Sequence, residues 1–270
     1  MKLKTLIISL LILIGTSISQ AQNIDDLSRD EIRELMPFVC AQISSPEVAQ
    51  MGEELTGMST TIKATIAAPD LVELKYTVPG YELGNSPQEQ ALTKLMIRSG
   101  SKNMPEAQKK LLTGFFKKGG YNLRIIYTDG GTHSCILNLT PTQLEDLYCG
   151  SIESIDIKPS EVRDAILKNF ASGVEQVETP GIKNTALIEG KWLTLNMLFD
   201  EGALTYPVEP DVFKSFLLDN YRNERVVVFL SSLINNEKDF IGLDGIKITY
   251  GTENGKKREC YITWNEITDY

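Results

Sequence analysis

The sequence predicts an α+β fold built from two tandem copies of one unit. Each copy is expected to contain a helix, a hairpin, a pair of helices and a second hairpin, with antiparallel sheets packed against helices. Three observations predict this fold. Strand-like alternation of apolar and polar residues occurs twice in the same order, a helical pair separates the strands each time, and an Asp-Gly or Asn-Gly turn lies near the end of each copy. The alternative is a common α+β pattern that occurs twice by coincidence.

Each copy begins with a helix followed by a hairpin. Ser28 and Glu31 form the Ser-x-x-Glu pattern of a capping box, and a similar helical segment starts at Ser160. The next residues alternate with the period of two that is typical of a half-buried strand. The expected strands are residues 61–67 and 72–77 in the first copy, and residues 185–188 and 193–199 in the second.

A helical pair comes next in each copy. The first pair is expected at residues 88–98 and 106–117, and the second at 211–221 and 225–235. The β-branched run at 226–230 is compatible with a buried strand, but the apolar spacing that follows it favours a helix.

A second hairpin closes each copy. The expected strands are residues 121–128 and 135–139, then 246–250 and 260–264. In this alignment Tyr127 corresponds to Tyr250, Cys135 corresponds to Cys260, and a short acidic tail follows each hairpin. The copies would span residues 22–150 and 151–270, with a boundary near Gly150 to Pro159. Tandem units of this kind resemble the layout of the β-lactamase-inhibitor-protein type, which implies a concave sheet surface offered to a partner.

Residues 1–21 have the pattern of a bacterial signal peptide. Two lysines precede an apolar run from Thr5 to Ile14, and small or polar residues lead to Ala21. We therefore expect cleavage before Gln22 and a periplasmic or secreted protein. The run is too short to span a bilayer, so a retained anchor is the weaker alternative, and we expect no membrane span after cleavage.

The charge of the chain argues against nucleic acid as a partner. The net charge is −9, and removal of Lys2 and Lys4 leaves 25 basic against 36 acidic residues, or −11. Nucleic-acid-binding proteins usually carry a basic surface instead. The basic residues at 256–258 follow an Asn-Gly turn and are interpreted as solvated turn charges.

The four cysteines form no Cys-x-x-Cys pair. Cys40 and Cys149 have no counterpart in the second copy, which makes them the candidate disulfide. Cys135 and Cys260 fall on the apolar side of strands and are interpreted as small buried thiols. A bridge between these two is the less favoured alternative.

His133 is the single histidine of the chain, and it lies on or just after a turn. One histidine excludes His-Glu-x-x-His and three-histidine metal sites, and the chain has no P-loop or dinucleotide fingerprint. We therefore expect no metal, no cofactor and no assigned catalytic residue. His133 and Cys135 could share a strand face, so His133 stays a weak binding candidate. Tyr261 is the other one, because it falls on the face opposite Ile262.

Three functions remain open. The favoured hypothesis is an exported, non-enzymatic binding or inhibitor-like protein of the cell envelope, which contacts a protein or other macromolecule through a sheet face or a cleft between the copies. A hydrolase that uses dispersed carboxylates is the second, and it predicts two facing acids of different pKa. A carrier of a small apolar ligand is the third, and it predicts a pocket of several hundred cubic ångströms.

Overall fold

The computed structural model describes residues 27–50, 60–78, 83–102, 104–175, 181–201, 209–223 and 225–268. The expected signal peptide, residues 1–21, lies outside these ranges, so its cleavage stays a prediction. The chain divides into two compact units between Lys158 and Pro159, which we call unit 1 and unit 2. The short 3₁₀ helix η2 (Ile152–Ser154) belongs to unit 1.

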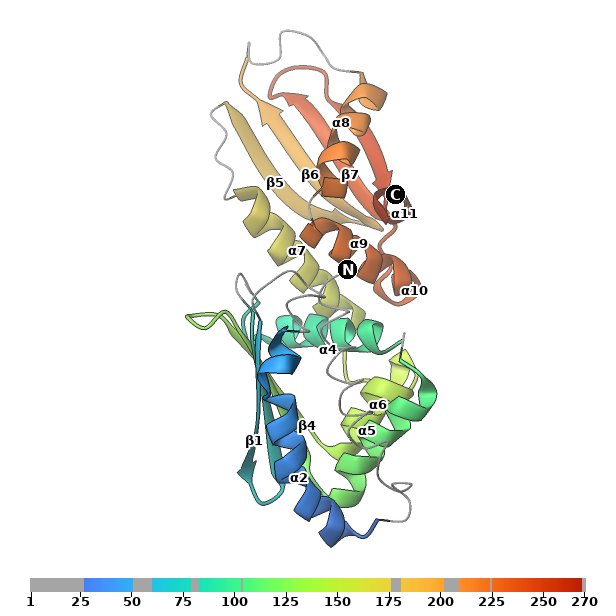
Figure 1. Ribbon diagram of the computed structural model, residues 1–270. Coiled ribbons are helices and arrows are strands. Elements are labelled where there is room, and N and C mark those ends of the chain that lie inside the picture. The colour runs from blue at the N-terminus through green and yellow to red at the C-terminus, as the bar shows by residue number, and fades with distance from the viewer. Residues whose placement is uncertain are drawn as a thin grey trace. The chain divides into compact units, whose positions relative to one another are not determined.

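Unit 1 alternates helices with strand pairs, and Figure 1 shows the arrangement of its elements. The elements whose bounds lie within the described ranges are, in chain order, α2 (Arg29–Ile43), β1 (Thr61–Ala68), β2 (Leu71–Thr77), α4 (Pro87–Ser101), α5 (Glu106–Gly119), β3 (Asn122–Thr128), β4 (Ser134–Leu139) and α6 (Pro141–Cys149). The capping box of Ser28 and Glu31 is present at the start of α2, as its sequence pattern predicted.

Unit 2 repeats this order with one short additional helix (Figure 1). Its elements are α7 (Pro159–Glu175), β5 (Ile182–Glu189), β6 (Trp192–Phe199), α8 (Pro210–Asn223), α9 (Arg225–Asn236), α10 (Lys238–Ile241), β7 (Gly245–Thr252), β8 (Arg258–Thr263) and α11 (Trp264–Thr268). The ambiguous run at 226–230 lies in α9 and is helical. The α+β fold in two similar halves is confirmed.

Each unit has one four-stranded sheet, with the orders β1-β2-β3-β4 and β5-β6-β7-β8. The two hairpins of each sheet are antiparallel, as predicted, but the central pairs β2–β3 and β6–β7 are parallel. The reason is the helical pair between the hairpins. A crossover through helices returns the chain to the same end of the sheet, so the next strand runs in the same direction.

The register of the two sheets identifies the residues that are equivalent between the units. Corresponding rows of inner-face residues are Ala64, Leu74, Ile125 and Leu137 in unit 1, and Ala186, Leu195, Ile248 and Cys260 in unit 2. Tyr127 pairs with Cys135, and Tyr250 pairs with Arg258. Tyr127 therefore does correspond to Tyr250, but the predicted equivalence of Cys135 and Cys260 is wrong by two residues, because strand pairing and not residue identity sets the register.

A short helix follows each closing hairpin, although the sequence pattern predicted only an acidic tail there. Thr140 and Gln143 form a capping box at the start of α6. At the start of α11 the backbone N–H of Thr263 donates to Glu266 Oε2 at 2.9 Å, and the N–H of Glu266 donates to Thr263 Oγ1 at 3.4 Å. The Thr-x-x-Gln and Thr-x-x-Glu patterns are the sequence signals that could have predicted both helices.

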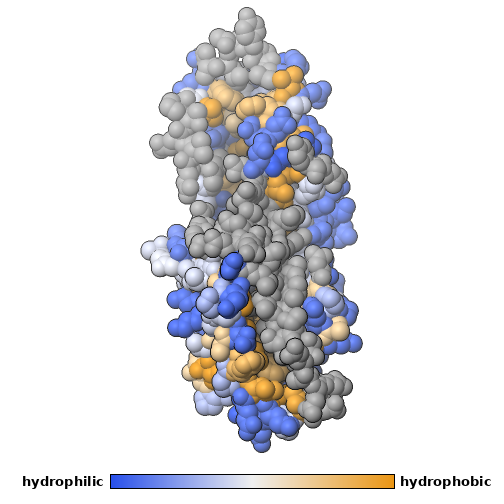
Figure 2. Space-filling view, viewed as in Figure 1, coloured by the Kyte–Doolittle hydropathy of each residue, from blue (hydrophilic) through white to orange (hydrophobic). Residues whose placement is uncertain are grey.

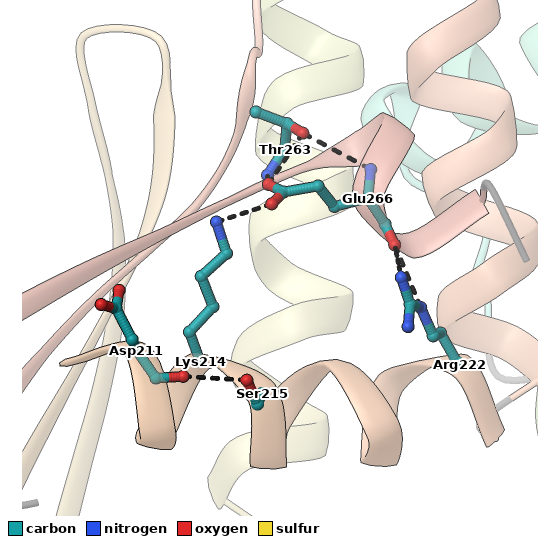
Figure 3. A network of polar contacts seen from close by, with 6 residues as sticks. All are labelled: Asp211, Lys214, Ser215, Arg222, Thr263 and Glu266. Atoms are coloured by element: carbon teal, nitrogen blue, oxygen red, sulfur yellow. Dashed lines mark hydrogen bonds and ion pairs between the residues drawn. The ribbon is translucent and has the colours of Figure 1, made fainter. Parts of the chain in front are cut away.

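Side chains of α8 bind the start of α11 in unit 2 (Figure 3). Lys214 Nζ lies 2.6 Å from Glu266 Oε1, and the Arg222 guanidinium donates to the Glu266 carbonyl oxygen at 2.9 and 3.1 Å. Burial opposes ionisation of Glu266, but hydrogen bonds from Lys214 and Thr263 outweigh it and hold the pKa of Glu266 below its usual value. This network fastens α8 to α11, so we interpret it as structural.

All four cysteines are free thiols in the structure, so the predicted Cys40–Cys149 bridge is not present. Cys40 is buried in α2, and burial raises the pKa of its thiol to about 11. Cys149 is the exposed last residue of α6, a helix that packs on α5. The two thiols therefore occupy different environments, one in the core and one at the surface. Cys135 and Cys260 are buried, as predicted.

Candidate functional site

The strongest candidate lies on the outer face of the sheet in unit 2, which is the face turned away from the helices. On the inner face, Phe213 of α8 packs against Tyr250, with ring centroids 4.3 Å apart. Because side chains alternate along a strand, Lys247 and Tyr261 project from the opposite face. Lys247 is paired in register with Thr194 on one side and with Tyr261 on the other, so these three side chains are neighbours.

Lys247 lies between two carboxylates. Its Nζ is 2.9 Å from Glu259 Oε1 and 3.4 Å from Glu189 Oε2, and Thr194 Oγ1 also donates to Glu189 Oε2, at 3.2 Å. The Lys247 side chain is only 18% exposed, whereas both carboxylates are nearly half exposed. The hydrogen bond to Glu259 raises the pKa of Lys247, and the same bond lowers the pKa of Glu259. Both groups are therefore charged at neutral pH.

Two aromatic rings complete this arrangement. Trp192 and Tyr261 meet edge to face with centroids 5.0 Å apart, and the Tyr261 hydroxyl donates to Glu259 Oε2 at 2.7 Å. That hydrogen bond raises the pKa of Tyr261, so the phenol stays protonated at neutral pH. Tyr261 is 41% exposed, which confirms the exposure that strand alternation predicted. We call Glu189, Trp192, Lys247, Glu259 and Tyr261 the Tyr261 cluster.

The equivalent positions of unit 1 carry a smaller polar network. Arg124 corresponds to Lys247, and its Nη1 lies 3.4 Å from Glu73 Oε2 while its Nε donates to Asn138 Oδ1 at 3.0 Å. The register places Leu71 at the position of Trp192, and Asn138 at the position of Tyr261. A central cation on the outer face is thus common to both units, whereas the aromatic pair distinguishes unit 2.

His133, the other predicted binding residue, lies in the turn between β3 and β4 of unit 1. Its Nδ1 is 3.0 Å from Asp129 Oδ2, and its backbone N–H donates to Asp129 Oδ1 at 3.1 Å. Hydrogen bonds from the Gly131 N–H and from His133 lower the pKa of Asp129. Cys135, two residues further on, is 0% exposed. An accessible Cys–His pair is therefore not formed, and His133 serves to order the turn.

A small cavity lies between the helices and the inner face of the sheet in unit 1. Its volume is about 20 Å³, and its lining includes Phe115, Tyr76, Tyr127 and Tyr148. Tyr76 and Tyr127 stack with centroids 4.8 Å apart. Burial raises the pKa of Tyr76 and of Tyr148, so both phenols stay neutral. The volume is enough for one water molecule and far too small for an apolar ligand.

Strand alternation pointed to Tyr261 but not to the charged residues Glu189, Lys247 and Glu259 around it. Alternation could have placed Trp192 and Lys247 on the outer face, since both flank inner-face residues of their strands. What alternation could not provide is the pairing of Lys247 with Tyr261, because this requires the register of two strands.

Within the described ranges, no group of three or more His, Cys, Asp and Glu side chains is placed to hold a metal ion. In the same part of the chain, no helix combines the length and the apolar character needed to cross a membrane. No protein-family model matches the sequence, and neither a curated protein nor a solved structure matches it at a significant level.

Proposed function

We propose that this is an exported, non-enzymatic binding or inhibitor-like protein, which contacts a macromolecule of the cell envelope through the outer face of the sheet in unit 2. The observation that carries the proposal is the Tyr261 cluster, in which two aromatic rings and three charged groups are ordered against one another on a strand face. The export part of the proposal rests on the signal-peptide pattern of residues 1–21.

The aromatic part of the cluster suits a contact residue. Tyrosine and tryptophan are enriched at the energetic centres of protein interfaces, because they bury a large area with few rotatable bonds. The ring of Tyr261 packs at a steep angle against Trp192, and its hydroxyl donates to Glu259. A side chain that is already ordered in the free protein loses little conformational entropy on binding. The Tyr261 side chain is therefore preorganised for binding in the free protein.

The charged part of the cluster indicates the chemistry of the partner. Two carboxylates surround one ammonium group, so the cluster carries a net negative charge. The Lys247 side chain is mostly covered, whereas the carboxylate side chains of Glu189 and Glu259 are nearly half exposed. Arginine, and to a lesser degree lysine, binds carboxylate oxygens through charge-assisted hydrogen bonds. We infer a partner surface with basic side chains around an apolar contact.

The exposed apolar side chains of the described residues do not gather around the Tyr261 cluster. Phe38 and Ile66 are exposed in unit 1, and Val212 and Phe216 are exposed on α8 of unit 2. Figure 2 shows hydrophobic residues at the surface of both units, bordered by hydrophilic ones. Because α8 packs on the inner face, its exposed pair lies on the other side of the sheet from Tyr261. The proposal therefore rests on a mixed aromatic and charged surface.

Two observations disfavour the other functions. An acid–base hydrolase needs one carboxyl group with a raised pKa opposite an ionised one. In the Tyr261 cluster the pKa of Glu259 is lowered instead, and Lys247 fills the space between the two glutamates. A carrier of an apolar ligand needs a pocket of about 300 Å³ or more. The cavity in unit 1 has about 20 Å³.

Substitution of Tyr261 by alanine should reduce the affinity for the partner at least about tenfold, as expected for a central contact residue. The measurement is quantitative affinity capture from cell-envelope extracts, followed by titration of the captured component. Asn138→Ala is the matched control, because Asn138 occupies the equivalent position in unit 1. A component that is retained equally by both variants would place the contact surface elsewhere.

The exported chain is expected to begin at Gln22. Intact mass spectrometry of protein isolated from the periplasm or the medium measures this directly. A chain that retains Met1 and remains in the cytosol would contradict the export part of the proposal, but not the binding surface itself.

A further inference from the structure

The outer edge of β5 has backbone groups that find no hydrogen-bond partner among the described residues. β5 is the first strand in its sheet and has β6 as its single neighbour there. Gly190 and Lys191 connect Glu189 to Trp192, and such a two-residue hairpin places a hydrogen-bonded pair next to its turn. At the other end, the Asp200 N–H donates to the Gly181 carbonyl oxygen at 2.8 Å. At both ends of the strand, therefore, the backbone groups of odd-numbered β5 residues form the hydrogen bonds to β6. Because these groups alternate in direction along a strand, the N–H and C=O groups of Asn184, Ala186 and Ile188 point away from β6.

The sheet of unit 1 closes the same positions with side chains. Ala64 is equivalent to Ala186, and Ser44 Oγ both accepts from the Ala64 N–H at 2.8 Å and donates to the Ala64 carbonyl oxygen at 3.2 Å. At the opposite edge, Asn85 Oδ1 accepts from the Ile136 N–H at 2.8 Å. Such capping prevents another strand from pairing with an edge.

The edge of β5 has no such cap within the described residues. The buried residues Ile32 of α2 and Val162 of α7 match in the two repeats, an offset of 130 positions. The same offset brings Ser44 to position 174, where the sequence has valine, a residue type without a hydrogen-bonding side chain. Among the residues that the structure describes, the edge that is capped in unit 1 therefore has no cap in unit 2.

We propose that β5 pairs with β5 of a second copy of this chain, antiparallel and with Ala186 opposite Ala186. This register joins the outward backbone groups of Ala186 to those of its counterpart, and the groups of Asn184 to those of Ile188. It also places Lys183 of each copy opposite Glu189 of the other copy, which gives two such pairs. All four of these side chains lie on the outer face, because odd-numbered residues of β5 share that face with Thr194 and Lys247.

Charge selects this register over its neighbours. A shift by two residues in one direction would place Lys183 opposite Lys191, and a shift in the other direction would place it opposite Leu187. Like charges directly opposite destabilise a strand pair, whereas opposite charges stabilise it. A shift by one residue would set outward backbone groups against inward ones. The register centred on Ala186 alone gives two opposite-charge pairs.

The side chains along the edge are also suited to this pairing. Ile182, Ala186, Leu187 and Ile188 are all only partly buried in one chain. A second β5 would cover them, which adds apolar burial to the backbone hydrogen bonds. The result is a continuous eight-stranded sheet with two copies of the Tyr261 cluster on one face. The pairing itself does not depend on what that face binds.

Light scattering coupled to size-exclusion chromatography of the mature chain tests the proposal. The expected mass is twice that of one chain. Ala186→Pro should give the mass of one chain, because the lost N–H points outward and proline is tolerated at a free edge. Its thermal unfolding should remain cooperative, which separates loss of pairing from loss of folding. A wild-type chain that is monomeric, or an Ala186→Pro chain that remains dimeric, would overturn the proposal.

A charge exchange tests the register. Lys183→Glu places like charges opposite each other and should weaken dimerisation about tenfold. The double variant Lys183→Glu with Glu189→Lys restores opposite charges and should recover the dimer, while Lys247 keeps Glu259 as its partner. Equal dimerisation of the wild type and the Lys183→Glu variant would refute this register. A monomeric wild type that binds an added extended peptide at β5 would instead assign the edge to another protein.

Discussion

Replacement of Gly245 by alanine is expected to destabilise unit 2 by about 3 kcal/mol, the upper part of the range for overpacking. Gly245 is the β7 residue between Trp192 and Thr263 in the sheet. A Cβ atom there would overlap the carbonyl oxygen of Ile262 and would lie 2.8 Å from Thr263 Cα and 2.9 Å from the Trp192 ring. Backbone atoms cannot rotate away as a side chain can, so the β7–β8 pairing must shift.

Tryptophan fluorescence during denaturant unfolding measures this effect, because Trp192 and Trp264 are the two tryptophans of the chain and both belong to unit 2. Gly190→Ala is the matched control. Gly190 has a positive φ of 60° but nothing within 4 Å of a new Cβ, so its substitution should cost only about 1 kcal/mol. Equal effects of the two substitutions would show that the space around Gly245 is not required.

Truncation of Phe115 to alanine should destabilise unit 1 by about 3–5 kcal/mol, which is typical for a fully buried aromatic ring. Phe115 of α5 is 1% exposed and lines the cavity against the sheet. Removal of the ring enlarges that cavity and removes its contacts. Circular dichroism should show the loss, whereas the fluorescence transition of unit 2 should stay in place, since Phe115 belongs to unit 1.

Phe38→Ala is the matched control, because it removes the same kind of ring from the same unit but at an exposed position. Phe38 is on α2 but is 56% exposed, so its truncation should change the free energy of unfolding by less than about 0.5 kcal/mol. If Phe38→Ala were as destabilising as Phe115→Ala, the assignment of the core of unit 1 would be wrong.

The elements that the sequence predicted are those with a strong local period. Strand alternation at residues 72–77 and helical spacing at 106–117 correspond to β2 and α5, because each pattern buries one face of a single element. The helices α6 and α11 were missed, since they are short and their caps, Thr140 and Thr263, come before the segments that were interpreted as acidic tails. The parallel central pair was missed because it joins strands that are distant in the sequence.

The candidate site divides in the same way. The exposure of Tyr261 follows from its position beside the buried Ile262, which alternation makes visible. The contacts of Lys247 with Glu189 and Glu259 join β7 to β5 and to β8. The alternation of apolar and polar residues within one strand cannot predict contacts between different strands. The cysteine alignment failed for this reason too. Cys260 lies opposite Ile248, whereas Cys135 lies opposite Tyr127.

Photo-crosslinking in intact cells tests the binding surface most directly. A benzophenone amino acid at position 261 should form an adduct with one macromolecule, and the same probe at position 138 should form none, because the two positions are equivalent in the repeats but differ in their aromatic neighbours. The adduct at 261 should disappear when Trp192→Ala removes the ring that orders this position. An adduct at 138 with none at 261, or no adduct at either position, would contradict a partner at the outer face of the sheet in unit 2.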